Sequence, residues 1–304
     1  MRSGVYAAEM LVPVGEVIGL ELHNDTVTVA AFDDTLTAGR EAGLQIGDEI
    51  VSIDSQPVDS AEDVRKALTH SDGAVELVVS RSGETRTIHM EPEITAAGPK
   101  LGVYLRQGIT GIGTVTYYDP DTDTFGTLGH AVNDGKGNLL EMSRGCAYPA
   151  SVVSVDKGKS GQPGQLKGAL KTNQLLGTLS GNTARGVFGT AAAGWSGSAI
   201  PTASYEEIQA GPATIRSTID GNGPRDYSVE ILKIYPRSRS DGRNLLLKVT
   251  DSRLLQTTGG IVQGMSGSPI IQSGKIVGAV THVLVNDPTT GYGIFIENML
   301  EAAS

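Results

Sequence analysis

The sequence is poor in cysteine, in aromatic residues and in basic charge. Its one cysteine, Cys146, excludes an internal disulfide framework and a multi-thiolate metal site. With 24 lysines and arginines against 34 acidic residues, the net charge of -10 leaves no basic stripe to neutralise phosphates, so we expect no nucleic acid partner. No apolar run approaches the roughly 18 residues of a membrane-spanning helix. As given, the chain is expected to be soluble.

Glycine and β-branched residues are plentiful instead. The 304 residues include 40 glycines, and short runs of Val, Ile and Thr alternate with turn residues. This pattern is typical of a mainly β protein with many tight turns. The length allows two domains, each with its own hydrophobic core.

Residues 11–93 have the pattern of one compact α+β module, preceded by an extension over residues 1–10. The expected elements are strands over 17–22 and 26–32, a turn and a strand over 42–53, a helix over 61–68 and a hairpin over 74–90. Ser60 is placed to cap the helix. We therefore expect this module to fold as a domain.

The segment Ala42–Asp54, Ala-Gly-Leu-x-x-Gly-Asp-x-Ile-x-x-Ile-Asp, closely resembles bacterial PDZ domains. That resemblance implies a peptide-binding groove in which the amides near Gly19 and Leu20 receive a terminal carboxylate. Val64 would line the groove, although a plain core role accounts for it equally well. The partner implied is a protein or peptide.

A joint containing Ala, Pro and Gly over residues 94–100 separates this module from a second domain over 101–304. Short strands divided by Gly, Asn, Asp and Ser turns predict paired or closed antiparallel β-barrels there. Helical pattern is sparse, and the clearest case lies near the C-terminus over 297–303.

The most informative stretch of the second domain is residues 259–269, which contains Gly-Met-Ser-Gly-Ser-Pro. Small residues on both sides of Ser266 allow a tight turn, in which the amides of Gly264 and Ser266 can form an oxyanion hole beside the hydroxyl. Ser266 is thus a candidate nucleophile. A second Ser-Gly-Ser at Ser196 lacks the following proline, and an ordinary turn explains it better.

A serine hydroxyl needs a base to take its proton and a further group to orient that base. Three of the five histidines lie in the first module, which leaves His130 and His282. We choose His130, because His282 lies within a predicted strand better suited to lining a substrate cleft.

Asp251 is the candidate for the orienting group, because it ends a predicted strand shortly before the Ser266 turn. Capping of the following segment is an equally good role for it on local sequence. Other aspartates remain open, most of them in glycine-rich loops where a turn role is simpler. They are Asp220, Asp226, Asp241 and Asp287.

Three motifs together resemble the SpoIVB peptidase family: Gly-Thr-Leu-Gly-His at 126–130, Lys-Val-Thr-Asp at 248–251 and the segment 259–270, all behind a PDZ domain. The resemblance implies a chymotrypsin-like double β-barrel serine endopeptidase with His130, Asp251 and Ser266 as its triad. It implies no cofactor and no metal ion.

The resemblance also implies a sporulation enzyme in the space between mother cell and forespore. Such an enzyme would cleave the extracytoplasmic part of a membrane-bound regulator of intramembrane proteolysis, trigger a late sigma factor and process its own N-terminal region. A membrane tether would require a segment ahead of this sequence. The alternative is a latent peptidase fold that acts as a PDZ-mediated binding and signalling module. A carbohydrate or small-ligand barrel leaves the three motifs unexplained.

Overall fold

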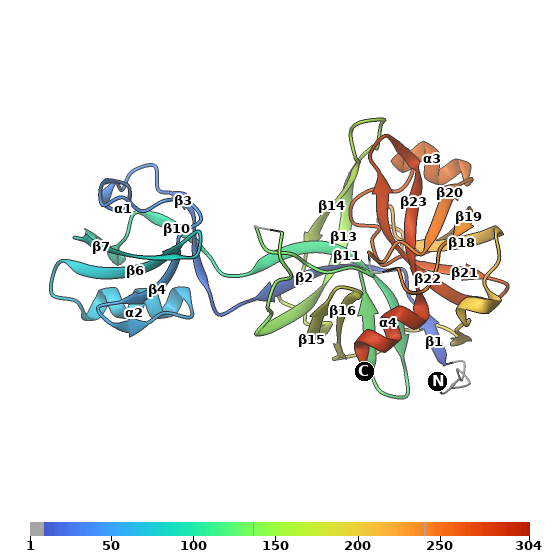
Figure 1. Ribbon diagram of the computed structural model, residues 1–304, viewed down its shortest axis with the longest axis horizontal. Helices are drawn as coiled ribbons and strands as arrows, with labels where there is room; N and C mark the ends of the chain where they lie inside the picture. Colours follow the sequence, from blue (N-terminus) through green and yellow to red (C-terminus); the bar gives the residue numbers. More distant parts are fainter. Residues whose placement is uncertain (1–8, 136, 240) are drawn as a thin grey trace. The chain divides into compact units, whose positions relative to one another are not determined.

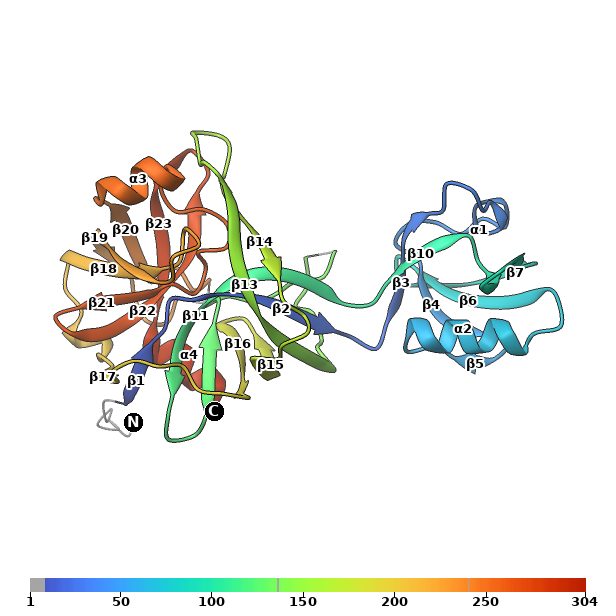
Figure 2. The same ribbon diagram turned by 180° about the vertical axis from the view of Figure 1, so that it is seen from behind.

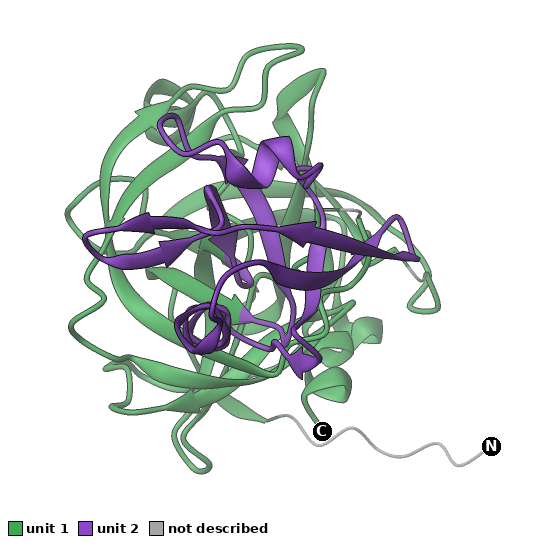
Figure 3. Ribbon diagram, turned by 90° about the vertical axis from the view of Figure 1, so that its left-hand side faces the viewer, with its two compact units in different colours: residues 1–22, 110–304 green, residues 23–109 purple. Residues whose placement is uncertain are grey.

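The computed structural model describes residues 9–135, 137–239 and 241–304, and its elements are mostly β-strands (Figure 1). The chain forms two compact units (Figure 3). One comprises residues 23–109, and the other combines the described residues up to Leu22 with residues 110–304. In the described part of the chain, no helix is long and apolar enough to cross a membrane.

The unit of residues 23–109 is a small sheet with two helices. Its strands follow the order β10-β3-β4-β6-β7, with β5 beside β4 and a separate β8-β9 hairpin. The elements are β3 (Val27–Phe32), α1 (Ala38–Glu41), β4 (Glu49–Ile53), β5 (Gln56–Pro57), α2 (Ala61–His70), β6 (Val75–Arg81), β7 (Glu84–Met90), β8 (Glu93–Thr95), β9 (Gly98–Lys100) and β10 (Val103–Arg106).

Local sequence signals in this unit are confirmed. The Ser60 hydroxyl accepts a hydrogen bond from the Asp63 amide and so caps α2. The β6–β7 hairpin turns through Ser82 and Gly83, both with positive φ, the geometry that two-residue hairpin loops favour. Val64 is buried in the unit's apolar core, in agreement with the core role considered for it.

The boundaries of this unit differ from those expected at 11–93. Residues 94–100 are not a linker, because they contribute to the β8–β9 hairpin, and β10 then pairs with β3. The strand expected over 17–22 in this unit is β2 (Val17–His23), and it lies in the other unit between β13 and β11. The backbone hydrogen bonds of each strand decide its unit, and they are not local in sequence.

In the larger unit, the first barrel is a ring of six strands. The pairings run β11-β12-β16-β15-β13-β2 and return to β11, while β14 pairs with β13 and β1 joins β11 to β17. The elements are β1 (Met10–Pro13), β11 (Ile109–Asp119), β12 (Thr124–Thr127), β13 (Arg144–Asp156), β14 (Gln165–Leu170), β15 (Gly177–Thr183), β16 (Gly186–Ala191) and β17 (Ile200–Pro201).

The second barrel is closed in the order β18-β19-β20-β23-β22-β21 (Figure 2). Alternation sets its inside: Tyr227, Val229 and Ile231 of β19 face the apolar core, and the residues between them are exposed. The elements are η1 (Tyr205–Glu207), β18 (Gly211–Ser217), β19 (Arg225–Ile234), β20 (Leu245–Val249), α3 (Ser252–Thr258), β21 (Pro269–Gln272), β22 (Lys275–Leu284), β23 (Asp287–Phe295) and α4 (Ile296–Ala303).

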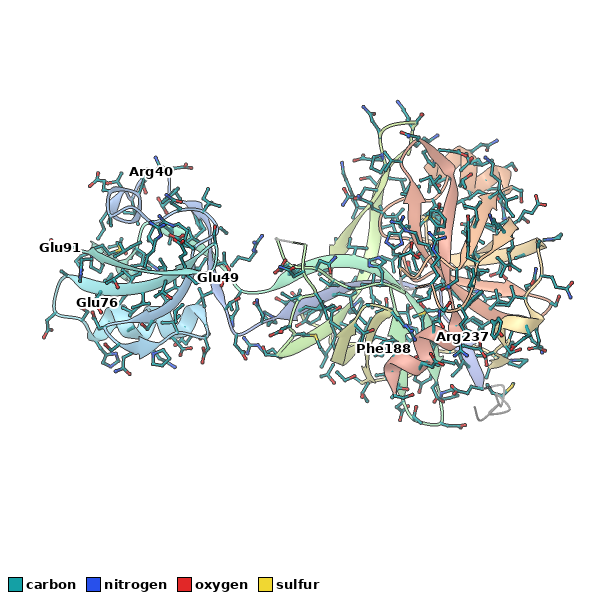
Figure 4. All side chains as sticks on the ribbon, viewed as in Figure 1. Arg40, Glu49, Glu76, Glu91, Phe188 and Arg237 are labelled. Carbon is teal, nitrogen blue, oxygen red and sulfur yellow. The ribbon has the colours of Figure 1, made fainter. Side chains whose placement is uncertain are left out.

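A shared apolar cluster joins the two barrels and the C-terminal helix. It contains Phe188 of β16, Ile294 of β23 and Met299 of α4, all buried. Figure 4 shows Phe188 at β16 and Arg237 beside α4, where Arg237 is bonded to Glu301. The helix expected near the C-terminus is therefore confirmed, and its packing holds the barrels together.

Candidate active site

The segment that carries Ser266 links α3 to β21 and is bent by glycines. Gly264 and Gly267 both have φ of +96°, a conformation that favours glycine. A Cβ on Gly267 would stand 1.9 Å from the carbonyl oxygen of Thr114, so the turn is pressed against β11 of the first barrel. Thr114 also donates its Oγ1 to the Gly264 carbonyl at 2.8 Å. Small residues are thus required by the close approach of the first barrel.

The peptide groups around Ser266 are held by their carbonyl oxygens. The Gln263 carbonyl accepts from the Leu166 amide at 2.8 Å, and the Met265 carbonyl accepts from the Ser268 amide at 3.0 Å. In a trans peptide the N–H points away from the C=O, so the following amides of Gly264 and Ser266 are directed away from these partners. Within the described residues, neither amide donates to a protein acceptor. They are two free donors, as an oxyanion hole requires.

The Ser266 hydroxyl itself has a partner on β22. Its Oγ donates to the carbonyl oxygen of Thr281 at 2.9 Å, and the side chain is half-buried. The backbone carbonyl of Ser266 accepts from the Thr114 amide at 2.9 Å. The hydroxyl must turn about its Cα–Cβ bond to leave Thr281 before it can reach a base.

His130 follows a strained turn that packs on the same strand. Leu128 has φ of +68° and Gly129 has φ of +70°, so two successive residues are left-handed, and Leu128 is not a glycine. A Cβ on Gly129 would come within 2.9 Å of Thr281 Cγ2. The turn before His130 and the Ser266 hydroxyl therefore both lie against Thr281.

The imidazole of His130 has a defined tautomer. Its Nδ1 lies 2.8 Å from the Ala131 carbonyl oxygen, and because a carbonyl only accepts, Nδ1 carries the proton. The lone pair is then on Nε2, the nitrogen that a general base uses towards serine. Burial lowers the pKa of His130 below its ordinary value, so the ring is neutral near pH 7.

His282, a residue of β22, lies next to His130. The ring centroids are 5.4 Å apart and the planes are tilted by 42°. Burial, together with the charges of His130 and Arg243, lowers the pKa of His282 to about 4, so this ring also stays neutral. Its Nδ1 is buried and has no hydrogen-bond partner among the described groups. The role of His282 in lining a substrate cleft stays a prediction.

Asp251 lies at the start of α3 and not beside His130. It is the N-cap of α3, and its carboxylate accepts from the amides of Arg253 at 2.9 Å and Leu254 at 3.1 Å. Its other oxygen accepts from the Arg253 guanidinium at 3.3 Å. Burial opposes ionisation, but these bonds outweigh it and hold the pKa of Asp251 below its ordinary value. The capping role is the one observed.

Strand register shows how far Asp251 lies from the histidines. On β23, Tyr292 pairs with His282 on one side and with Leu246 of β20 on the other. Asp251 is five residues beyond Leu246, which is about 17 Å along an extended chain. No hydrogen bond joins it to His130 in the described structure. The expected contact between Asp251 and His130 is therefore corrected.

The other aspartates considered for this role also have partners of their own. Asp226 pairs with Arg216, Asp241 with Arg239, and Asp287 with Lys248. Asp220 accepts from the Asn222 amide in its turn. Among these four, Asp241 is the one whose charge affects the pKa of His282, but its carboxylate accepts from Nε and Nη2 of Arg239.

The turn at Ser196 has different surroundings from the turn at Ser266. Ser196 is exposed, and its neighbour Trp195 packs on Tyr118 and Phe125 of the first barrel. The Trp195 indole donates to Glu16 at 3.1 Å. These contacts make the segment a surface turn, in keeping with its expected role.

The predicted carboxylate loop of the PDZ module is not where the resemblance put it. Gly19 and Leu20 belong to β2 of the first barrel, and a Cβ on Gly19 would collide with Leu170 at 2.3 Å. Leu20 is buried. Because the strand is enclosed by β13 and β11, its amides serve the barrel and do not form a peptide site of the smaller unit.

Sequence reasoning missed the residues that act through their backbone. No sequence motif marks the Thr281 carbonyl or the left-handed Leu128. The one local signal is the glycine directly before His130, because glycine is typical of turns. Among the described residues, no group of three or more His, Cys, Asp or Glu side chains could hold a metal ion.

Comparison with known proteins now adds to this geometry. The family model of the SpoIVB peptidase S55 matches residues 98–300, and that of the PDZ domain matches residues 37–81. The chain belongs to the SpoIVB peptidase S55 family. It also carries a PDZ domain.

Individual relatives cover less of the chain. A Bartonella henselae protein named as a zinc metalloprotease is 34% identical over 82 residues, which are 27% of this chain and 22% of that protein's length. The PDZ domain of an SdrC-like protein from Listeria monocytogenes is 20% identical, with a TM-score of 0.24, over 27% of this chain and 87% of that one. The inactive form of the protease Rv3671c is 12% identical, with a TM-score of 0.35, over 64% of this chain and 82% of that one.

Proposed function

We propose that this SpoIVB-type peptidase hydrolyses peptide bonds by acyl transfer from Ser266, with His130 as the general base. The supporting observation is that Ser266 and the turn before His130 both lie against Thr281 of β22, while the His130 tautomer leaves Nε2 free. In the described residues, Nε2 has no hydrogen-bond partner.

The reaction needs one rotation before it begins. Ser266 Oγ releases the Thr281 carbonyl, turns towards His130 Nε2 and attacks the substrate carbonyl as the imidazole takes its proton. The amides of Gly264 and Ser266 stabilise the oxyanion that forms. His130 then returns the proton to the leaving amine, and water hydrolyses the acyl-enzyme.

The substrate backbone can be held along β22. This strand pairs with β23 up to Leu284, whereas its pairing with β21 ends at Ala279 and its backbone hydrogen bonds to the Ser266 turn end at Val280. We propose that an extended substrate pairs with the edge beyond Val280 and reaches Ser266 from there. The same stretch, with His282, would shape the primary specificity pocket.

The biological setting follows from the family. We propose a sporulation enzyme that acts outside the cytoplasm, between mother cell and forespore, on a membrane-bound regulator of intramembrane proteolysis. Its action would trigger a late sigma factor, and it would also process its own N-terminal region. The PDZ domain would recruit a protein terminus. Support for these finer statements is the family membership alone.

The test is labelling by phenylmethylsulfonyl fluoride, read by intact mass, together with cleavage of an unfolded protein substrate. Wild type, Ser266→Ala and the matched control Ser196→Ala should first be shown folded by circular dichroism. We expect one adduct and cleavage for wild type and Ser196→Ala, and neither for Ser266→Ala. A folded wild type with no adduct and no cleavage would favour the latent binding module instead.

A further inference from the structure

Asn182, at the end of β15, uses its whole side-chain amide to hold the segment after His130. Its Oδ1 accepts from the Val132 amide at 2.9 Å. Its Nδ2 donates to the carbonyl oxygens of Val132 at 2.8 Å and Leu140 at 2.9 Å. Asn182 takes no part in the proton transfers proposed for Ser266 and His130.

These bonds connect Asn182 to the imidazole through one peptide group. The carbonyl of the Ala131–Val132 peptide accepts from His130 Nδ1, and the N–H of the same peptide donates to Asn182 Oδ1. Hydrogen bonds in such a chain polarise one another, more strongly where water is excluded. A peptide group thus stands between the histidine and its supporting polar side chain.

Both ends of this connection are rigid. Asn182 sits in the β15–β16 hairpin, paired with Val187, and the hairpin is tightened by Thr183 Oγ1, which donates to the Gly186 carbonyl. At the other end, the Leu140 amide donates to the Val132 carbonyl at 3.0 Å. The Val132–Asn133 peptide is therefore held at its carbonyl by both Leu140 and Asn182, next to the Ala131–Val132 peptide whose N–H donates to Asn182.

The partners also explain why the residue is asparagine. Asn182 faces one N–H and two carbonyl oxygens, and a primary amide offers one acceptor and two donors. A carboxylate of the same shape would place an acceptor against two carbonyl oxygens. The amide orientation follows from these three partners.

We propose that Asn182 is a positioning residue for His130, acting through the Ala131–Val132 peptide. It holds the carbonyl that keeps the proton on Nδ1 and thereby keeps Nε2 basic. This proposal rests on the proposed function of His130 as the base.

The first test is the nitrogen-15 chemical shifts of the His130 ring in the folded wild-type protein, assigned with a His130→Gln variant. We expect the Nδ1–H tautomer in wild type and a shift towards Nε2–H in Asn182→Asp and Asn182→Ala. An Nε2–H ring in wild type, or an unchanged tautomer in a folded variant, would overturn the proposal. This readout does not depend on catalysis, so it stands even if the peptidase assignment fails.

The second test is kinetic. In Asn182→Asp we expect kcat to fall about 100-fold, as for a base displaced by about 1 Å, with KM within about twofold of wild type. The control Asn222→Asp makes the same change at an exposed turn asparagine and should retain wild-type kcat. If Asn182→Asp does not fold, Asn182→Ala replaces it. A folded variant with wild-type kcat would contradict the proposal, whereas inactivity of wild type would count against the proposed function.

Discussion

The two Ser-Gly-Ser turns of this chain share their sequence but not their surroundings. The turn at Ser266 is pressed against β11, and its hydroxyl is bonded to β22. The turn at Ser196 is exposed on the first barrel beside Trp195. Reactivity therefore depends on what the fold brings to a serine, since both hydroxyls have the same intrinsic chemistry.

The largest contrast between the turns should appear in catalysis. We expect Ser266→Ala to lower kcat by about a millionfold, because loss of the nucleophile disables the catalytic residues as a unit. Ser196→Ala should stay within about twofold of wild type. Initial rates on a defined peptide measure both. Equal losses in the two variants would remove the distinction drawn here.

The glycines after the two serines should differ in their effect on folding. Gly267→Ala forces a Cβ to within 1.9 Å of a backbone oxygen at φ of +96°, and we expect it to lower the free energy of unfolding by about 3 kcal/mol. At Gly197 the nearest atom is a side-chain carbon of Val12 at 2.8 Å, so Gly197→Ala should cost about 1 kcal/mol. Urea unfolding measures both, and a reversed order would contradict the packing described.

Only the Ser266 turn follows a helix capped by aspartate, and this cap offers a finer test. Because asparagine caps helices as well as aspartate does, Asp251→Asn should preserve kcat within about threefold, and Asp251→Ala should cost about 1 kcal/mol of stability. If Asp251 instead oriented His130, Asp251→Asn would lower kcat by about four orders of magnitude. Steady-state kinetics and thermal unfolding of the two variants separate these roles.

The smallest expected effect is the pH dependence of Ser266 labelling and of the protein's stability. The pKa of His130 is lowered by burial, so labelling of Ser266 should reach half its maximum below pH 6.5 and rise with pH through that point. In the folded state His282 also has a lowered pKa, about 4, and the unfolded chain binds more protons below pH 6.5. Stability is thus lost as pH falls from about 6.5 towards 4. His282→Gln should reduce this loss of stability at low pH. An unchanged pH profile of stability in His282→Gln would refute the assignment of the loss to His282.

Some features could be predicted because they depend on neighbours in sequence. The Ser60 cap, the Ser82-Gly83 hairpin and the glycine-bent turn at Ser266 each follow from residues a few positions apart. The same holds for the C-terminal helix. The density of short strands and turns predicted paired or closed antiparallel barrels, and the family resemblance implied the double barrel.

Features that depend on distant pairing could not be predicted in this way. The sequence pattern places the strands expected over 17–22 and 26–32 in one module, yet β2 and β3 pair with strands of different units. Local sequence favours a capping role and an orienting role for Asp251 equally. Only the strand register shows that Asp251 lies away from His130.

By itself the sequence determined the chemistry available: a serine in a bendable turn, a histidine in a Gly-Thr-Leu-Gly-His motif, and no thiolate cluster or basic surface to suggest another function. The tertiary structure alone decided which groups meet. Thr281 receives the hydroxyl from one barrel and the His130 turn from the other, and Asn182 reaches Val132 across 50 positions of sequence. Local propensities act over one turn or hairpin, whereas these contacts arise when buried apolar faces and backbone hydrogen bonds bring remote strands together.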